Sequence, residues 1–122
     1  MASAIVVDDN RLTADALCKM LEILGVETRV AYGPRAAILD IKKHPVDLIF
    51  LDINMPGVDG FEVLGYLRRE PDLQHIPVVM VTSDDQPETA IRAQKTGALH
   101  LMLKPVTVEA LEKIVQKTKL FP

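Results

Sequence analysis

The chain of 122 residues carries 14 Lys and Arg against 17 Asp and Glu, which gives a formal net charge of −3. Apolar residues make up 48% and charged residues 25%, a balance typical of a globular protein rather than a disordered one. The basic residues form no stripe of the kind that binds nucleic acid, and no apolar run is long enough to span a membrane. We therefore expect a protein that binds neither nucleic acid directly nor a membrane.

The length and the cysteine content indicate one domain in a reducing compartment. No linker or repeat interrupts the sequence, so we expect a single domain over residues 1–122, long enough for one hydrophobic core. Cys18 is the one cysteine and cannot form an internal disulfide, which is consistent with a cytoplasmic location.

The first half of the chain predicts three strands and two helices. Short aliphatic runs typical of buried strands cover residues 4–7, 27–31 and 47–51. Leucines at helical spacing follow the first run as far as Gly25, which ends that helix. Pro34 suits the first turn of a second helix.

The second half continues the same alternation. Asp59 followed by Glu62 resembles a capping box at the start of a third helix. Strand patterns then alternate with helical ones, in the order strand 76–81, helix 87–94, strand 99–103 and helix 107–117.

Five strands alternating with five helices predict a parallel sheet covered on both faces. The expected fold class is therefore α/β, a single doubly wound (βα)5 sandwich whose five strands follow the order 2-1-3-4-5. In sheets of this kind ligands bind beyond the carboxyl ends of the strands, where the strand order reverses.

Polar residues stand at four of these carboxyl ends. Asp8 and Asp9 follow the first strand, Asp52 the third, Thr82 the fourth and Lys104 the fifth. Because strands one and three are neighbours in the expected order, the three carboxylates would converge and repel one another unless a cation is present or one is protonated. Carboxylate oxygens favour Mg²⁺, which also takes phosphate oxygens as ligands. Lys104 and Thr82 would complete a cradle for a phosphoryl group.

Several short motifs carry a resemblance to a known family. They are Val6-Val7-Asp8-Asp9-Asn10, Leu51-Asp52-Ile53-Asn54-Met55-Pro56-Gly57, Asp59-Gly60, Val81-Thr82-Ser83 and Lys104-Pro105. Each is common alone, but in this order the chain resembles the receiver domains of two-component response regulators over essentially its whole length. The resemblance implies a flavodoxin-like fold.

The resemblance also implies a metal site. Asp9 would bind Mg²⁺ directly and Asp8 mainly through metal-bound water. Asp52 and the backbone carbonyl of Asn54 would be further ligands.

For the phosphoryl group, the resemblance implies that Asp52 is the acceptor and that Lys104 and Thr82 contact the phosphoryl oxygens. The donor would be a histidine kinase or a histidine phosphotransfer protein. Such a protein catalyses only its own phosphorylation and dephosphorylation, and passes the signal to a downstream effector through a changed binding face. The Lys104–Pro105 bond is expected to be cis.

The chain departs from the family pattern at the fifth strand. Leu101 stands where many receivers have Tyr or Phe, so a rotating aromatic ring cannot report phosphorylation. A homodimer through helix 87–94, strand 99–103 and helix 107–117 would be more hydrophobic than ionic, because Leu99 and His100 replace a usual acidic residue.

Two further positions, Asn54 and Asp84, tune the lifetime of the phosphoryl group in this family. We expect a short lifetime, because Asp84 could orient an attacking water.

Other interpretations stay open from the sequence alone. The acid pair Asp8-Asp9 could be a solvated turn, Thr82 a helix cap and Lys104 a surface lysine. A Mg²⁺-dependent aspartyl phosphatase or phosphotransferase is a rival function. Such an enzyme needs an acid two residues after its nucleophile, and Asn54 at this position cannot act as that acid. A pseudo-receiver that signals without phosphorylation is a second rival, favoured only by Leu101.

Overall fold

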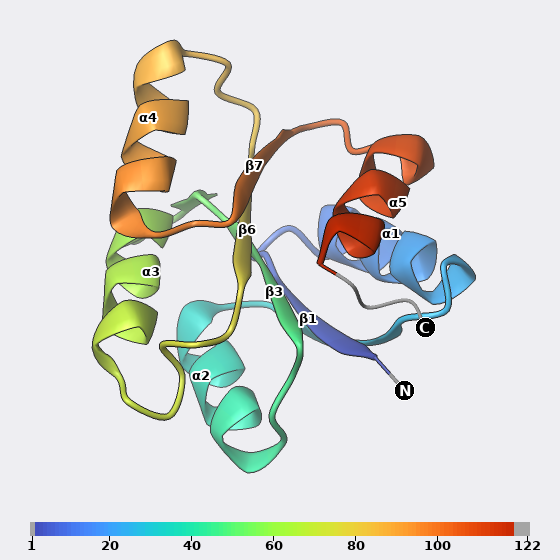
Figure 1. Ribbon diagram of the computed structural model, residues 1–122, viewed down its shortest axis with the longest axis horizontal. Helices are drawn as coiled ribbons and strands as arrows, with labels where there is room; N and C mark the ends of the chain where they lie inside the picture. The colour runs from blue at the N-terminus through green and yellow to red at the C-terminus, as the bar shows by residue number, and fades with distance from the viewer. Residues whose placement is uncertain (1, 119–122) are drawn as a thin grey trace.

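The computed structural model describes residues 2–118 as one α/β unit (Figure 1). The expected domain limits at residues 1 and 122 lie outside the described residues. The elements in chain order are β1 (Ser3–Val7), α1 (Arg11–Ile23), β2 (Glu27–Ala31), α2 (Pro34–Lys43), β3 (Leu48–Asp52), β4 (Asn54–Met55), β5 (Val58–Asp59), α3 (Gly60–Arg69), β6 (Val78–Thr82), α4 (Pro87–Thr96), β7 (His100–Leu103) and α5 (Val108–Lys117).

The main sheet has five parallel strands in the order β2-β1-β3-β6-β7. This is the predicted order 2-1-3-4-5 once the two short strands β4 and β5 are set aside, so the predicted fold is confirmed. Helices α1 and α5 cover one face, and α2, α3 and α4 cover the other (Figure 1). Within residues 2–118 no helix combines the length and the apolar character that crossing a bilayer requires.

The central strands are buried on both sides, which explains their uninterrupted apolar sequence. In β3, Leu48 and Phe50 pack under α1 and α5, whereas Ile49 and Leu51 pack against the helices of the other face. All five residues of β3 are buried, including the polar Asp52 at its end.

Several element boundaries differ from the prediction by one or two residues. The fourth strand of the main sheet begins at Val78 rather than at residue 76, because Pro77 has no backbone N–H to donate to a neighbouring strand. Asp52 and Thr82 are the last residues of their strands rather than the first loop residues. The ends of the ladders therefore position both side chains directly.

The small hairpin of β4 and β5 was not predicted. Asn54 pairs with Asp59 and Met55 with Val58, around a turn in which Gly57 has φ 74°. Strands of two residues are too short to produce a periodic pattern. Asp59 does begin α3 as predicted, with its carboxylate accepting a hydrogen bond from the Phe61 N–H at 2.8 Å.

Arg68 on α3 ties three segments together through its guanidinium. Nε donates to the carbonyl of Gly97 at the end of α4, at 3.1 Å. Nη1 donates to the carbonyls of Gln74 and Ile76, at 3.0 and 2.9 Å. A planar fork of donors suits three carbonyls that one ammonium group cannot satisfy together.

We predict that Arg68→Ala lowers the free energy of unfolding by about 2–3 kcal/mol, because three carbonyls lose a charged donor. Arg68→Lys should recover less than half of this loss. Urea unfolding measures both, with Arg69→Ala as the matched control at an exposed neighbour. Equal stabilities of the Arg68→Ala and Arg69→Ala proteins would contradict the prediction.

Candidate functional site

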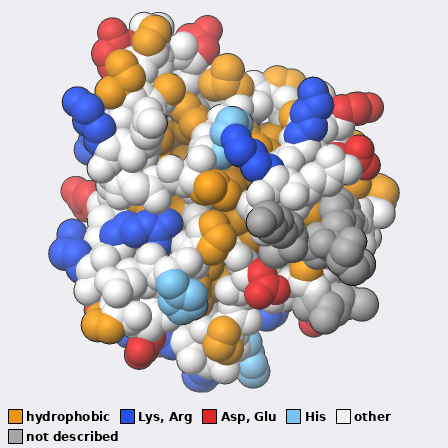
Figure 2. Space-filling model, viewed as in Figure 1, with side chains coloured by type: hydrophobic (Ala, Val, Ile, Leu, Met, Phe, Trp, Pro, Cys, Tyr) orange, Lys and Arg blue, Asp and Glu red, His pale blue; other side chains and the backbone are white. Residues whose placement is uncertain are grey.

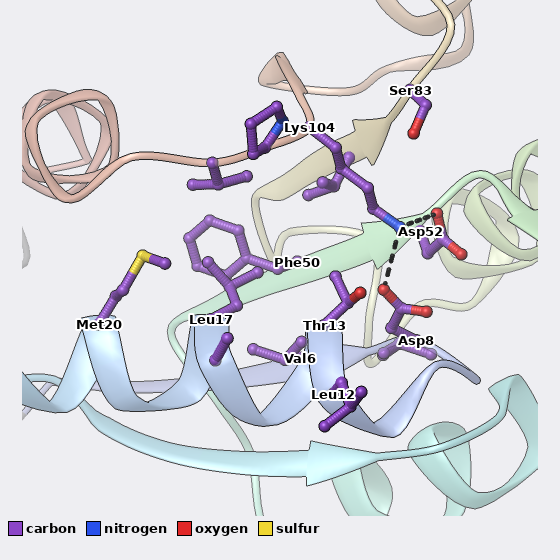
Figure 3. A pocket seen from close by; sticks show the side chains of 15 residues that line it. Val6, Asp8, Leu12, Thr13, Leu17, Met20, Phe50, Asp52, Ser83 and Lys104 are labelled. Atoms are coloured by element: carbon purple, nitrogen blue, oxygen red, sulfur yellow. Dashed lines mark hydrogen bonds and ion pairs between the residues drawn. The ribbon is translucent and has the colours of Figure 1, made fainter.

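Three of the predicted site residues meet at the carboxyl edge of the main sheet. The Lys104 Nζ lies 3.2 Å from Asp8 Oδ2 and 3.2 Å from Asp52 Oδ1 (Figure 3). Asp8 and Asp52 are 3% and 4% exposed, so both carboxylates are buried around one lysine. The convergence expected from strand order is present.

Backbone and side-chain hydrogen bonds hold these groups at the strand ends. The Asp8 N–H donates to the carbonyl of Ala31, which extends the β1–β2 ladder by one residue. Asp8 Oδ1 accepts from the Asn10 N–H at 2.9 Å, and the Asn10 side chain caps α1 by accepting from the Thr13 N–H. The Lys104 N–H donates to the carbonyl of Thr82 at 2.8 Å.

Gly60 lets the loop after β3 close tightly over the strand end. A Cβ at Gly60 would lie 2.6 Å from the carbonyl oxygen of Asp52 and 2.7 Å from the Cα of Ile53. The Gly60 N–H donates to the Ile53 carbonyl at 2.8 Å. The Asp59-Gly60 motif therefore lets α3 begin directly beside the end of β3, since any larger residue at position 60 would push α3 away from Asp52.

The donor set fits a hard divalent cation. Asp8, Asp9 and Asp52 each offer a carboxylate oxygen, and these oxygens lie within 4.8 Å of one another. Asp9 is exposed, which leaves the cluster open to solvent on one side. Three carboxylates beside one lysine leave an excess of negative charge, and oxygen donors of this kind suit Mg²⁺.

The crowding of charge also changes the acid–base behaviour of the cluster. Burial and the carboxylate of Asp8 raise the pKa of Asp52 to about 6, against the lowering effect of Lys104. Burial lowers the pKa of Lys104, but the carboxylates of Asp52 and Asp8 outweigh it, so the pKa is raised. Lys104 therefore stays charged, and Asp52 is the group whose ionisation is opposed.

Thr82 lies at the same edge but does not contact Asp52 by a hydrogen bond within residues 2–118. Its buried hydroxyl oxygen accepts from the Asn54 side-chain amide at 3.3 Å and from the Asp84 N–H at 3.1 Å. Thr82 therefore connects to the β3–α3 loop on one side and to the loop before α4 on the other.

Asp84 has contacts that were not foreseen. Its carboxylate accepts from the Thr89 hydroxyl at 2.6 Å and from the Gln86 N–H at 2.9 Å, and these two bonds lower the pKa of Asp84. In this conformation both oxygens are engaged with α4, so orienting a water would require those bonds to open. The short phosphoryl lifetime stays a prediction.

The residues of β7 and the peptide bond that follows it can be compared with the expectations directly. The Lys104–Pro105 bond is cis, as expected. Leu101 is partly buried and packs against the core on the side of α2, α3 and α4.

No sequence pattern indicated that the Thr89 hydroxyl bonds to Asp84. Thr89 lies 37 residues along the chain from Asp52, in a helix without a motif.

An apolar groove of about 450 Å³ opens beside the acidic cluster. Leu12, Leu17 and Met20 of α1 line it together with Phe50 of β3 (Figure 3). Pro105 and Val106, which follow β7, also line it. The groove reaches Asp52 and Lys104 at one end. A partner seated there would have direct access to the carboxylate of Asp52.

We predict that the metal-free protein loses stability through Asp52 as the pH rises from about 4 to about 6. The native state holds the Asp52 proton up to the folded pKa of about 6, whereas the unfolded chain releases it near 3.8, so rising pH favours unfolding within this window. Asp52→Asn should therefore raise the free energy of unfolding at pH 7 by about 1–2 kcal/mol.

Urea unfolding in EDTA, at several pH values from 4 to 7, measures the difference between wild type and Asp52→Asn. The matched control is Asp72→Asn, at an exposed carboxylate outside the cluster. A difference between wild type and Asp52→Asn that does not grow across this window would refute the prediction.

Comparison with known proteins places these features in a family. The family model that describes the response regulator receiver domain matches residues 4–116 of this chain. The response regulator protein FleR of Pseudomonas aeruginosa is 32% identical over 117 residues, covering 95% of this chain and 24% of FleR. The chain thus spans about a quarter of that relative. The polar-differentiation response regulator DivK of Brucella ovis is 36% identical over 107 residues, covering 87% of this chain and 86% of DivK.

Solved structures agree with this result. The chemotaxis protein CheY4 of Vibrio cholerae superimposes with a TM-score of 0.90 at 30% identity, covering 97% of this chain and 98% of that one. Receiver domains are the signalling switches of two-component systems, accepting phosphoryl groups and interacting with kinases or phosphotransfer proteins and with effectors. The chain belongs to the family of response regulator receiver domains.

Proposed function

We propose that this chain is a Mg²⁺-dependent phosphoacceptor switch whose nucleophile is Asp52. The observation that carries the proposal is the position of the Lys104 ammonium, 3.2 Å from the buried carboxylates of both Asp8 and Asp52. A lysine so placed holds a cationic group where a phosphoryl oxygen on Asp52 would lie. The proposed receiver unit covers residues 1–122.

The metal ligands in this proposal are Asp8, Asp9, Asp52 and the backbone carbonyl of Asn54. The cluster of the three carboxylates, with its excess negative charge, supports this assignment. When bound, Mg²⁺ supplies positive charge that neutralises the carboxylates and the phosphoryl oxygens.

Asp52, Lys104 and Thr82 each have a separate role in the proposed phosphoryl transfer. A carboxylate oxygen of Asp52 attacks the phosphorus of a phosphohistidine, so that a P–O bond forms and the P–N bond breaks, leaving the imidazole nitrogen with the electron pair. Lys104 turns from Asp8 toward the transferred group and stabilises its oxygens. Within the described part of the chain the Thr82 hydroxyl only accepts hydrogen bonds, so its own hydrogen is left to donate to a phosphoryl oxygen.

The partner that delivers the phosphoryl group is a histidine kinase or a histidine phosphotransfer protein. The apolar groove between α1 and Pro105-Val106 leads to Asp52 and offers a surface for a partner helix carrying the histidine. We place this exchange in the cytoplasm, in keeping with the single free Cys18. The phosphorylated form then binds a downstream effector through a changed surface.

The rival enzyme function has less support. Asn54 stands where an aspartyl phosphatase needs an acid, and its amide donates to Thr82. A pseudo-receiver is disfavoured because the acid cluster and the lysine are both in place.

We predict that acetyl phosphate or phosphoramidate adds one phosphoryl group to the wild-type protein only when Mg²⁺ is present. Asp52→Asn should abolish the gain, because the nucleophile is lost. Asp9→Asn should slow it about tenfold or more by weakening the metal site, because changes to residues that only support metal ligands already cost roughly 10- to 100-fold. Intact mass measures the modification, with Asp72→Asn as a control that should behave as wild type.

Each alternative gives a different result in this experiment. A pseudo-receiver would bind Mg²⁺ without gaining mass. An aspartyl phosphatase would release phosphate steadily from a generic ester, and that turnover would exclude the proposed role.

We also propose that a homodimer, if formed through α4, β7 and α5, is held by apolar contacts. Ile91, Leu99 and Leu103 on this face are 51%, 44% and 50% exposed. Hydrophobic side chains gather along β7 between α4 and α5 (Figure 2). Sedimentation at low and high salt should show an unchanged or tighter dimer, whereas steep dissociation as salt rises would mean an ionic one.

A further inference from the structure

A chain of hydrogen bonds runs from the Thr82 hydroxyl to helix α4. The Asp84 N–H donates to Thr82 Oγ1 at 3.1 Å. The Asp84 carboxylate accepts from the N–H of Gln86, the N-cap of α4, and from the hydroxyl of Thr89 in its first turn. One residue therefore binds Thr82 with its backbone and α4 with its side chain.

The first turn of α4 has few other ties to the fold. Ala93 is the one buried residue of this helix, all of which lies within the described residues, and Gln86 makes no side-chain cap. The second turn is held by Arg92, whose guanidinium lies 4.1 Å from the centre of the Phe61 ring. The C-terminal end is held at Gly97 by Arg68. The start of α4 thus depends on Asp84.

Leu101 cannot transmit phosphorylation by rotating an aromatic ring. It packs partly buried against the core and has neither a ring to rotate nor a hydroxyl to donate. A route from the phosphoryl site to the α4 surface must therefore pass through other groups.

We propose that the contact between Asp84 and Thr89 is that route, coupling the position of the Thr82 hydroxyl to the first turn of α4. The inference rests on the proposed phosphorylation of Asp52. Since the Thr82 hydroxyl makes no hydrogen bond to Asp52 within residues 2–118, reaching a phosphoryl oxygen there requires the Thr82 side chain to turn about its Cα–Cβ bond. This turn carries the Thr82 oxygen away from the part-buried Asp84 N–H, which then loses its acceptor. Because an unpaired N–H there is costly, the segment 83–86 follows Thr82. The Asp84 carboxylate then draws the first turn of α4 with it, and the α4 surface shifts between two populations.

The test compares backbone NMR spectra and amide exchange of wild type, Thr89→Ala, Thr89→Ser and Thr96→Ala, before and after treatment with acetyl phosphate and Mg²⁺. Thr96 is the matched control because, among the residues that the structure describes, its hydroxyl bonds only to the Arg92 carbonyl within α4. Intact mass records phosphorylation in every sample. The amides of Gln86, Ala90 and Ile91 report on the first turn.

In wild type and Thr96→Ala, phosphorylation should shift these three amides. In Thr89→Ala, phosphorylation should proceed to the same extent, but exchange before phosphorylation should already be about fivefold faster, as expected for one lost hydrogen bond. Phosphorylation should then add less than about a third of the wild-type shift, since the link to Thr82 is broken. Thr89→Ser, which keeps the hydroxyl, should restore the wild-type response.

Two results would overturn the inference. If phosphorylated Thr89→Ala shows the full wild-type shifts in α4, the signal does not pass through this contact, although Asp52 remains a phosphoacceptor. If wild type gains no mass, the proposed function fails and the coupling fails with it.

Discussion

Two carboxylates buried at the ends of neighbouring parallel strands impose the main physical constraint on this protein. Asp8 and Asp52 would each be costly to bury alone, and together they repel. Lys104 compensates part of the charge, at 3.2 Å from both. The raised pKa of Asp52, about 6, reflects the part that is not compensated. A site with this residual charge favours a cation.

The rest of the fold keeps these charges in position. The β1–β3 ladder aligns Val7 with Leu51, so the next residues of both strands carry the two acids to the same edge. Gly60 allows the following loop to lie against the Asp52 backbone. The backbone bond from Lys104 to Thr82 fixes the lysine on the other side of Asp52. Stability and site geometry therefore come from the same buried strands.

Helix α4 contrasts with this rigid centre. It buries one alanine, whereas α3 buries five residues, and polar contacts supply most of its attachment. Regions held in this way open at lower free energy than a packed core does. A switch benefits from this division, because charge added at the rigid edge can shift a loosely held helix without disturbing the sheet.

Much of this protein was determined by sequence pattern alone. The alternation of apolar runs and helical stripes predicted the parallel sheet, because burial on both faces demands such runs. The strand order was predicted as a common arrangement of such sheets. The acids after strands one and three, with Lys104 before Pro105, predicted the edge at which they meet. These features are local, or follow from chain topology.

Tertiary structure alone decided the contacts that depend on side-chain direction. The Thr82 hydroxyl oxygen accepts from Asn54 and Asp84 and has no hydrogen bond to Asp52 within residues 2–118, and the Asp84 carboxylate accepts from the Thr89 hydroxyl of α4. The sequence pattern also did not predict that Asp52 and Thr82 end their strands, because a strand ends where its pairing with the neighbouring strand ends. The hairpin of β4 and β5 was not predicted because two-residue strands have no periodic pattern. Hydrogen bonds between loops depend on distances set by the whole fold, and no local sequence signal encodes them.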